Sequence, residues 1–115
     1  MWWRSGLLLC AGAFLGCASG PRPIASPEAS AAAIRAAEEL QAASDPRGAL
    51  YLQLAKEGME RGKEMVARGD RERAEAMFAR AEADADVALA VTRAQKTRAE
   101  AEQVKQRLDS LKEGM

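Results

Sequence analysis

Chemically reactive side chains are scarce in this sequence of 115 residues. Thiolates bind metals and act as nucleophiles, but both cysteines, Cys10 and Cys17, lie near the start of the chain. The remainder therefore has no thiol for a disulfide framework or a zinc cluster. Histidine, the usual base at neutral pH and the commonest metal ligand, is absent. We therefore expect a protein that is not an enzyme and that uses no metal and no cofactor.

Three carboxylates, Glu82, Asp84 and Asp86, stand close together in the sequence. Paired carboxylates can serve in acid–base catalysis or bind calcium, but residues two apart on a helix do not face each other. A solvated helix face, or a local salt bridge to Arg80 or Arg93, is the simpler interpretation. Because the sequence also has no glycine-rich phosphate loop, we expect no small-molecule substrate.

The N-terminus has the three parts of a secretory signal. One positive side chain, Arg4, precedes an apolar stretch of about eleven residues at 6–16, and small residues follow from Cys17 onward. A helix that spans a membrane needs about 20 apolar residues, so this stretch is too short to be one. The pattern predicts export, with residues 1–16 as the signal peptide.

Residues 14–17, with the sequence FLGC, resemble a bacterial lipobox, although Phe14 stands where that family prefers leucine. The resemblance implies that Cys17 receives a diacylglycerol thioether and becomes the mature N-terminus. Cys10 fits the pattern poorly, because the residue before it is not small. Ala18, in place of an aspartate after the cysteine, implies sorting to the outer membrane, facing the periplasm. The alternative is ordinary signal cleavage after Ala18, which would release a soluble protein.

Start signals divide the remaining chain into a tether and helices. Residues 17–26 combine glycine, proline and small polar residues, so we expect a lipid-anchored flexible tether. A capping oxygen precedes a proline at Pro27 and again at Pro46, and proline suits the first position of a helix. Gly69 and Asp70 predict the end of one helix and the cap of the next. The predicted helices of this Ala-rich domain, residues 27–115, cover residues 27–44, 46–68 and 70–113.

Each predicted helix has an apolar face rich in alanine. In the first, Ile34 and Leu40 are the only large apolar residues. Gly58 and Gly62, four apart, would let two backbones approach closely, so we predict tight packing within an antiparallel helical hairpin. The stripe of the second helix comprises Leu50 or Tyr51, Leu54, Gly58, Gly62, Met65 and Val66. The face of the third comprises Ala74, Met77, Phe78, Ala81, Ala85, Ala88 and Leu89, and it continues as a near-heptad seam of Ala101, Val104, Leu108 and Leu111.

Helix lengths leave two all-α arrangements open. At 1.5 Å per residue the third helix is about 65 Å long, and the first two are roughly 27 Å and 33 Å. The two shorter helices could lie end to end, bent at Pro46, along the long one. Alternatively, the first could fold back into a three-helix bundle, and the end of the third would project and pair with another copy. The extended form is the preferred prediction.

A second resemblance covers residues 50–93. It rests on Leu54 and Ala55, the Gly69-Asp70 turn, Ala74, Met77, Ala81, Asp84 and Ala88. This segment is similar to a family of short Ala-rich helical bacterial lipoprotein domains of unknown function. Members are often fused to an OmpA-like peptidoglycan-binding domain. The sequence ends without one, so the resemblance does not imply wall binding by that route.

Charge and composition limit the classes of molecule that the protein is expected to bind. The 17 basic and 17 acidic residues balance, and residues 93–107 mix both signs without aromatics, so we expect no nucleic-acid binding. Because alanine buries little area, self-association or a protein partner in the envelope is plausible. We expect a non-enzymatic, lipid-anchored envelope protein that acts as a helical spacer or protein-docking module. The alternative is a secreted soluble periplasmic adaptor or chaperone-like binding protein.

Overall fold

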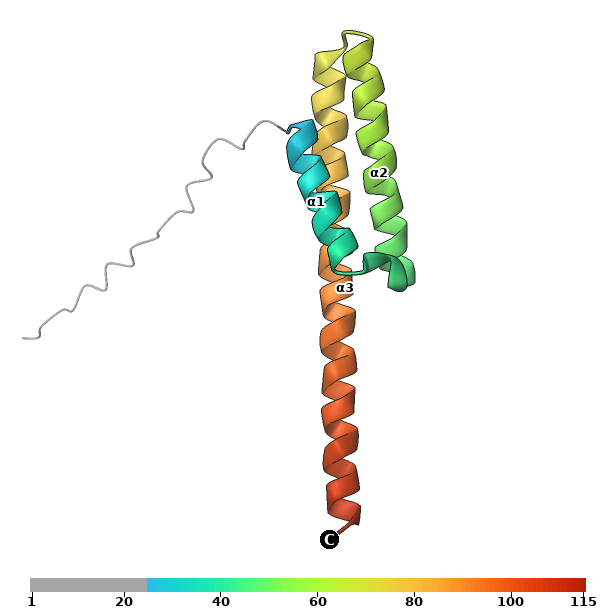
Figure 1. Ribbon diagram of the computed structural model, residues 1–115, viewed down its shortest axis with the longest axis vertical. Coiled ribbons are helices and arrows are strands. Elements are labelled where there is room, and N and C mark those ends of the chain that lie inside the picture. Colours follow the sequence, from blue (N-terminus) through green and yellow to red (C-terminus); the bar gives the residue numbers. More distant parts are fainter. Residues whose placement is uncertain (1–24) are drawn as a thin grey trace, which may run out of the picture.

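The computed structural model describes residues 25–115, which form helices α1 (Pro27–Glu39), α2 (Pro46–Ala67) and α3 (Arg71–Glu113), with a 3₁₀ turn η1 (Ala42–Ser44) between α1 and α2. No strand occurs in this part of the chain. The all-α prediction is confirmed, and α2 and α3 form the predicted antiparallel hairpin (Figure 1). The predicted signal peptide and most of the predicted tether lie outside the described residues.

The three long helices begin where the local sequence signals predict. Ser26, Asp45 and Asp70 each accept a hydrogen bond from the backbone N–H three residues ahead, at 3.2 Å for the first two and 3.3 Å for Asp70. Pro27 and Pro46 occupy the first helical position, where a missing N–H costs no hydrogen bond. Start positions are therefore fixed by side chains within one turn of each helix.

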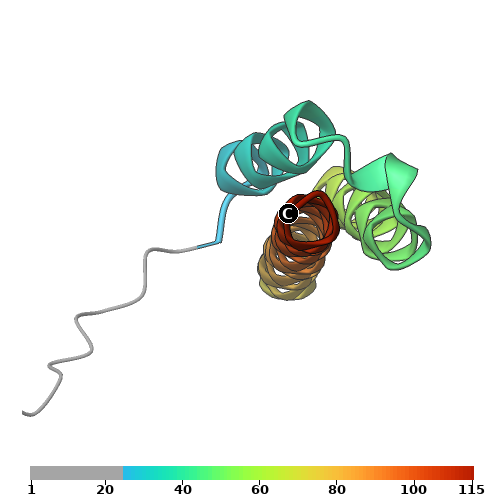
Figure 2. The same ribbon diagram turned by 90° about the horizontal axis from the view of Figure 1, so that it is seen from below.

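The preferred extended arrangement is wrong, because α1 folds back along the hairpin. The helix ends at Glu39 instead of Ser44, and Gln41 adopts a left-handed backbone conformation with φ of 64°. This residue and η1 together reverse the chain, so α1 packs against both α2 and α3. Seen end-on, the three helices stand at the corners of a triangle (Figure 2).

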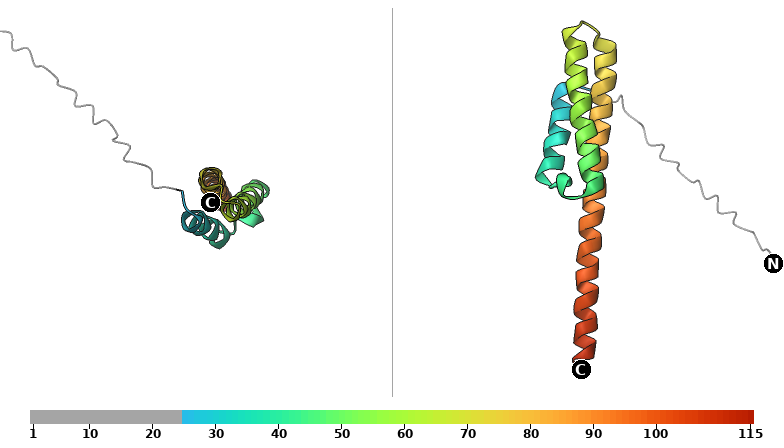
Figure 3. Two further views of the ribbon diagram at one scale, coloured as in Figure 1. Left: turned by 90° about the horizontal axis from the view of Figure 1, so that it is seen from above. Right: turned by 90° about the vertical axis from the view of Figure 1, so that its right-hand side faces the viewer.

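The apolar pattern of α3 explains why α1 and α2 cover only its first half. The buried residues of this helix recur at alternating spacings of four and three and end at Thr92. The seam residues Val104, Leu108 and Leu111 lie about 100° to 160° around the helix axis from Thr92, at 100° per residue. The predicted continuation of one face is therefore wrong: the seam lies on the other side of the helix. All residues from Arg93 onward are exposed, and α3 extends well beyond the other helices (Figure 3).

Small side chains dominate the core. The predicted face of α3 is correct, since its four alanines and Phe78 are buried and Met77 and Leu89 are partly buried. The predicted stripe of α2 is partly wrong: Leu50 and Val66 are half exposed, whereas Leu52 and Ala55 are buried. The buried residues Gly48, Leu52, Ala55, Gly58 and Gly62 recur at spacings of three and four, and Leu50 lies off that face. In α2, glycine and alanine face α3, as close helix contact requires.

One buried hydrogen bond joins α1 to α3. The hydroxyl of Ser30, fully buried, donates to the carbonyl oxygen of Phe78 at 2.9 Å. The same hydroxyl also lies 3.1 Å from the carbonyl oxygen of Ser26. Because a buried hydroxyl without a partner would be destabilising, these two acceptors account for a polar residue in the core. The bond to Phe78 also fixes where α1 lies along α3.

Replacing Ser30 should therefore weaken the bundle. We expect Ser30→Ala to lower the free energy of unfolding by about 1 kcal/mol, the net value of one hydrogen bond, measured by urea denaturation. The matched control is Ser110→Ala, because the Ser110 hydroxyl donates to Arg107 at 2.8 Å but is exposed. We expect no measurable change there, and equal losses in both variants would contradict a specific role for the α1–α3 bond.

Candidate functional site

The glycines of α2 mark the closest helix contact. A Cβ atom at Gly58 would lie 3.2 Å from the Cβ of Ala81, and one at Gly62 would lie 2.5 Å from the Phe78 ring. Both glycines are buried. The missing side chains at these positions therefore make room for α3 rather than for a ligand.

A third glycine of α2, Gly48, has a similar role, which the sequence does not predict. A Cβ atom there would collide with the carbonyl oxygen of Ala42 and would lie 2.7 Å from the hydroxyl of Thr92. That hydroxyl donates to the carbonyl oxygen of Ala88 at 2.8 Å. Gly48 thus lets η1, α2 and α3 meet where the bundle ends. Only the chain reversal brings Ala42 to this position, so spacing along α2 carries no signal for it.

The α2–α3 connection consists of ordinary capping interactions. Gly69 has a φ of 81°, which glycine adopts without steric cost. The backbone N–H of Gly69 donates a hydrogen bond to the carbonyl oxygen of Val66 at 3.0 Å. The backbone N–H of Asp70 donates to the carbonyl oxygen of Met65 at 2.9 Å. The Gly69-Asp70 pair therefore ends α2 and caps α3, and the geometry gives it no further chemical role.

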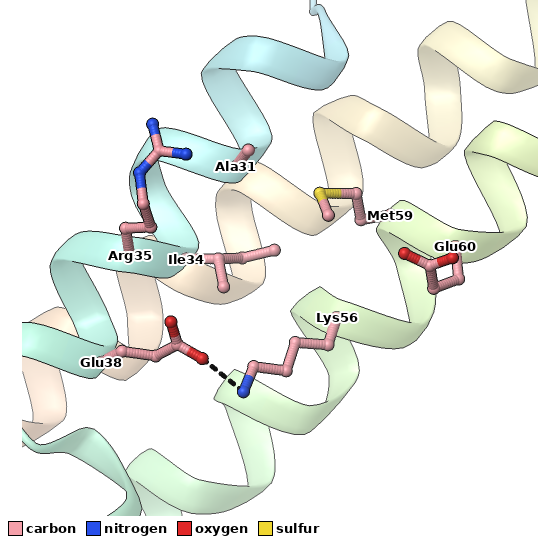
Figure 4. Close-up of a pocket in the computed structure, with 7 residues that line it drawn as sticks. All are labelled: Ala31, Ile34, Arg35, Glu38, Lys56, Met59 and Glu60. Atoms are coloured by element: carbon pink, nitrogen blue, oxygen red, sulfur yellow. Dashed lines mark ion pairs between the residues drawn. The ribbon is translucent and has the colours of Figure 1, made fainter.

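A shallow groove of about 460 Å³ lies between α1 and α2 (Figure 4). Ile34 and Met59 supply apolar wall, and an ion pair of 2.5 Å joins Glu38 of α1 to Lys56 of α2. Both partners of this pair are about half exposed, so solvent screens their attraction. The residues that line the groove are Ala31, Ile34, Arg35, Glu38, Lys56, Met59 and Glu60.

Within the carboxylate cluster of α3, Asp84 forms a local salt bridge with Arg80. Arg80 lies 3.8 Å from Asp84, one helical turn away, whereas Asp86 is exposed. Oδ2 of Asp84 is buried without a hydrogen-bond partner within the described chain, but 17% of the side chain remains exposed. Among residues 25–115, no group of acidic, cysteine or histidine side chains could hold a metal ion.

Comparison with known proteins finds no family model, no characterised relative and no solved structure that matches the chain. Its function must therefore be inferred from its own residues. Cys17, the predicted lipidation residue, lies outside the described part of the chain. Within that part, no helix is both long enough and apolar enough to span a bilayer.

The exposed part of α3 presents a continuous apolar surface. We call Ala101, Val104, Leu108 and Leu111 the distal seam. Its three large residues are 60%, 52% and 61% exposed. They recur at heptad spacing on the part of α3 beyond Thr92, where every residue is exposed in the described structure, and such spacing suits pairing with another helix. The distal seam is therefore the best candidate functional surface.

Proposed function

We propose that this is a non-enzymatic, lipid-anchored protein of the bacterial cell envelope that acts as a helical spacer and protein-docking module. The observation that supports docking is the exposed part of α3. About 20 residues beyond Thr92 form a single helix with an apolar seam, which corresponds to roughly 30 Å of length. A bundle that holds such a helix clear of its own core is suited to presenting it to a partner.

The lipid anchor is supported by the N-terminal sequence. Cys17 follows a small residue at the end of an apolar stretch, as in a lipobox, and Ala18 favours the outer membrane. One acyl chain binds a membrane only marginally, whereas two or more hold a protein stably. The two or three chains of a lipoprotein would therefore fix one end of this protein at the membrane. Partner binding would then occur at a distance set by the tether and the helices.

Mass spectrometry of the N-terminus tests the anchor. We expect the chain expressed in a bacterium to begin at a diacylated or triacylated Cys17. Cys17→Ser should abolish the added lipid mass and leave uncleaved precursor, because lipid addition to the thiol comes before cleavage of the signal peptide in this pathway. Cys10→Ser is the matched control and should be processed normally. An unmodified chain starting at Ser19 would instead support the secreted soluble adaptor.

A further inference from the structure

The charges beside the distal seam are strongly segregated. In a heptad that places Ala101 and Leu108 at a and Val104 and Leu111 at d, the flanking e and g positions hold mostly basic residues. These are Arg98, Lys105, Arg107 and Lys112, with Glu100 as the single acidic member. The acidic residues Glu102, Asp109 and Glu113 fall at b and f, away from the seam. The chain is neutral as a whole, yet the edges of its exposed apolar surface are positive.

These flanking charges oppose pairing of the seam with a second copy. In a parallel pair, g residues face the e residues of the next heptad, so Arg107 would meet Lys112. Only Glu100 would meet an opposite charge, at Lys105. In an antiparallel pair, e positions face each other, and all three of them are basic. The antiparallel orientation therefore brings like charges together along the seam, and the parallel orientation does so at Arg107 and Lys112.

The seam is also poorly suited to a lipid surface. Helices that lie in a membrane interface have a broad apolar face and commonly use tryptophan or phenylalanine. Residues 93–115 contain no aromatic residue. Their large apolar residues are confined to a narrow a/d stripe, which is the pattern of a helix–helix contact.

The geometry points to one occupant: we propose that the distal seam binds an amphipathic helix of another protein, with acidic residues flanking its apolar stripe. Apolar residues of that helix would cover Val104, Leu108 and Leu111, and its carboxylates would pair with the basic e and g side chains. Complementary charges at these positions select partner and orientation in paired helices. This inference rests on the proposed docking role and specifies the chemical class of the partner.

A designed peptide provides a direct probe. It is a fluorescein-labelled peptide of three heptads with leucine at a and d and glutamate at e and g, so that its own charges oppose self-pairing. A comparison peptide carries lysine at e and g. The full chain is held in phosphatidylcholine nanodiscs, and binding is followed by fluorescence anisotropy. We expect the acidic peptide to bind at least tenfold more tightly than the basic one, with affinity falling as salt increases.

Matched variants locate the binding surface. Leu108→Gln should weaken binding of the acidic peptide at least tenfold, whereas Gln106→Ala, on the other side of the helix, should leave it unchanged. Reversing charge with the double substitution Lys105→Glu and Lys112→Glu should reverse the preference between the two peptides. All four positions are exposed, so thermal melts should show an unchanged bundle.

Three results would overturn the inference. Equal affinity for both peptides would remove the charge argument. Dimerisation of the chain through Leu108, seen by sedimentation and lost in Leu108→Gln, would assign the seam to a second copy. Loss of peptide binding when phosphatidylglycerol enters the nanodisc would assign it to anionic lipid. The N-terminal mass of the same preparation tests the anchor separately, so failure of one proposal is distinguishable from failure of the other.

Discussion

Proline at two positions of α3 should differ greatly in its effect on stability. Ala85→Pro is expected to destabilise the bundle by at least about 3 kcal/mol, enough to remove much of the stability of a small domain. Ala85 is fully buried against the other helices, and proline there removes a helix hydrogen bond and collides with the preceding turn. We expect little or no cooperative thermal transition by circular dichroism.

Ala101→Pro is the matched substitution in the exposed half of the helix. Proline there disrupts the helical turn between Thr97 and Ala101, which comes after the last buried residue of the helix, Thr92. We therefore expect the thermal midpoint of the bundle to remain within about 2 °C of the parent, since no core contact changes. Helical signal from the exposed segment should fall. A clear drop in the midpoint would mean that the exposed half of α3 packs against something in the isolated protein.

Alanine at Gly62 should destabilise the bundle by about 2 kcal/mol, within the range for overpacked cores. The new methyl group would overlap the ring of Phe78, which is only 2% exposed. The higher helix propensity of alanine, about 1 kcal/mol over glycine, is insufficient to offset this overlap. Urea denaturation gives the free-energy change.

Gly58→Ala provides the control for that propensity gain. Its methyl group would approach Ala81 at 3.2 Å, a much smaller intrusion, so we expect stability within about 0.5 kcal/mol of the parent as propensity and crowding offset each other. Combining Gly62→Ala with Phe78→Leu should recover part of the loss expected from adding the two single effects, because the pair is in direct contact. Strict additivity would contradict the proposed overlap.

Helix starts were predictable because their causes are local. Ser26, Asp45 and Asp70 each satisfy a backbone N–H within the next turn, and such patterns are legible in a short stretch of sequence. The buried face of α3 was predictable for a related reason. Alanines at four-and-three spacing on a long helix specify one side of it whatever packs there.

Features that depend on contacts between helices were harder to predict from the sequence. Gln41 reverses the chain in a left-handed conformation that usually belongs to glycine, so nothing in its identity predicts the turn. The prediction for α2 was wrong at Leu50 and Val66 because several neighbouring apolar residues could continue the stripe, and only contact with the other helices shows that Leu52 and Ala55 are the buried ones. The position of the distal seam on α3 needed only the angular offset between Thr92 and Val104. Because the apolar spacing is regular within each half of α3, the spacing alone does not show that the two halves face different sides.

For the candidate site, the sequence identified the residues of the distal seam and the packing glycines Gly58 and Gly62, but it did not reveal which would remain exposed. Exposure depends on where α1 and η1 lie, and therefore on the reversal at Gln41. Gly48 illustrates the same limit, since its closest contact, the carbonyl of Ala42, belongs to the turn. Contacts that depend on a chain reversal cannot be read before that reversal is known.

The change of apolar side along α3 has an energetic consequence. One unbroken helix serves two cooperative units: residues up to Thr92 are stabilised by the bundle, and those beyond it only by their own backbone hydrogen bonds. Local opening of the second unit therefore requires much less free energy than global unfolding. A partner helix that covers the distal seam would order this segment without depending on, or disturbing, the stability of the bundle. Substitutions in the exposed part of α3 can therefore change affinity for a partner without changing the stability of the bundle.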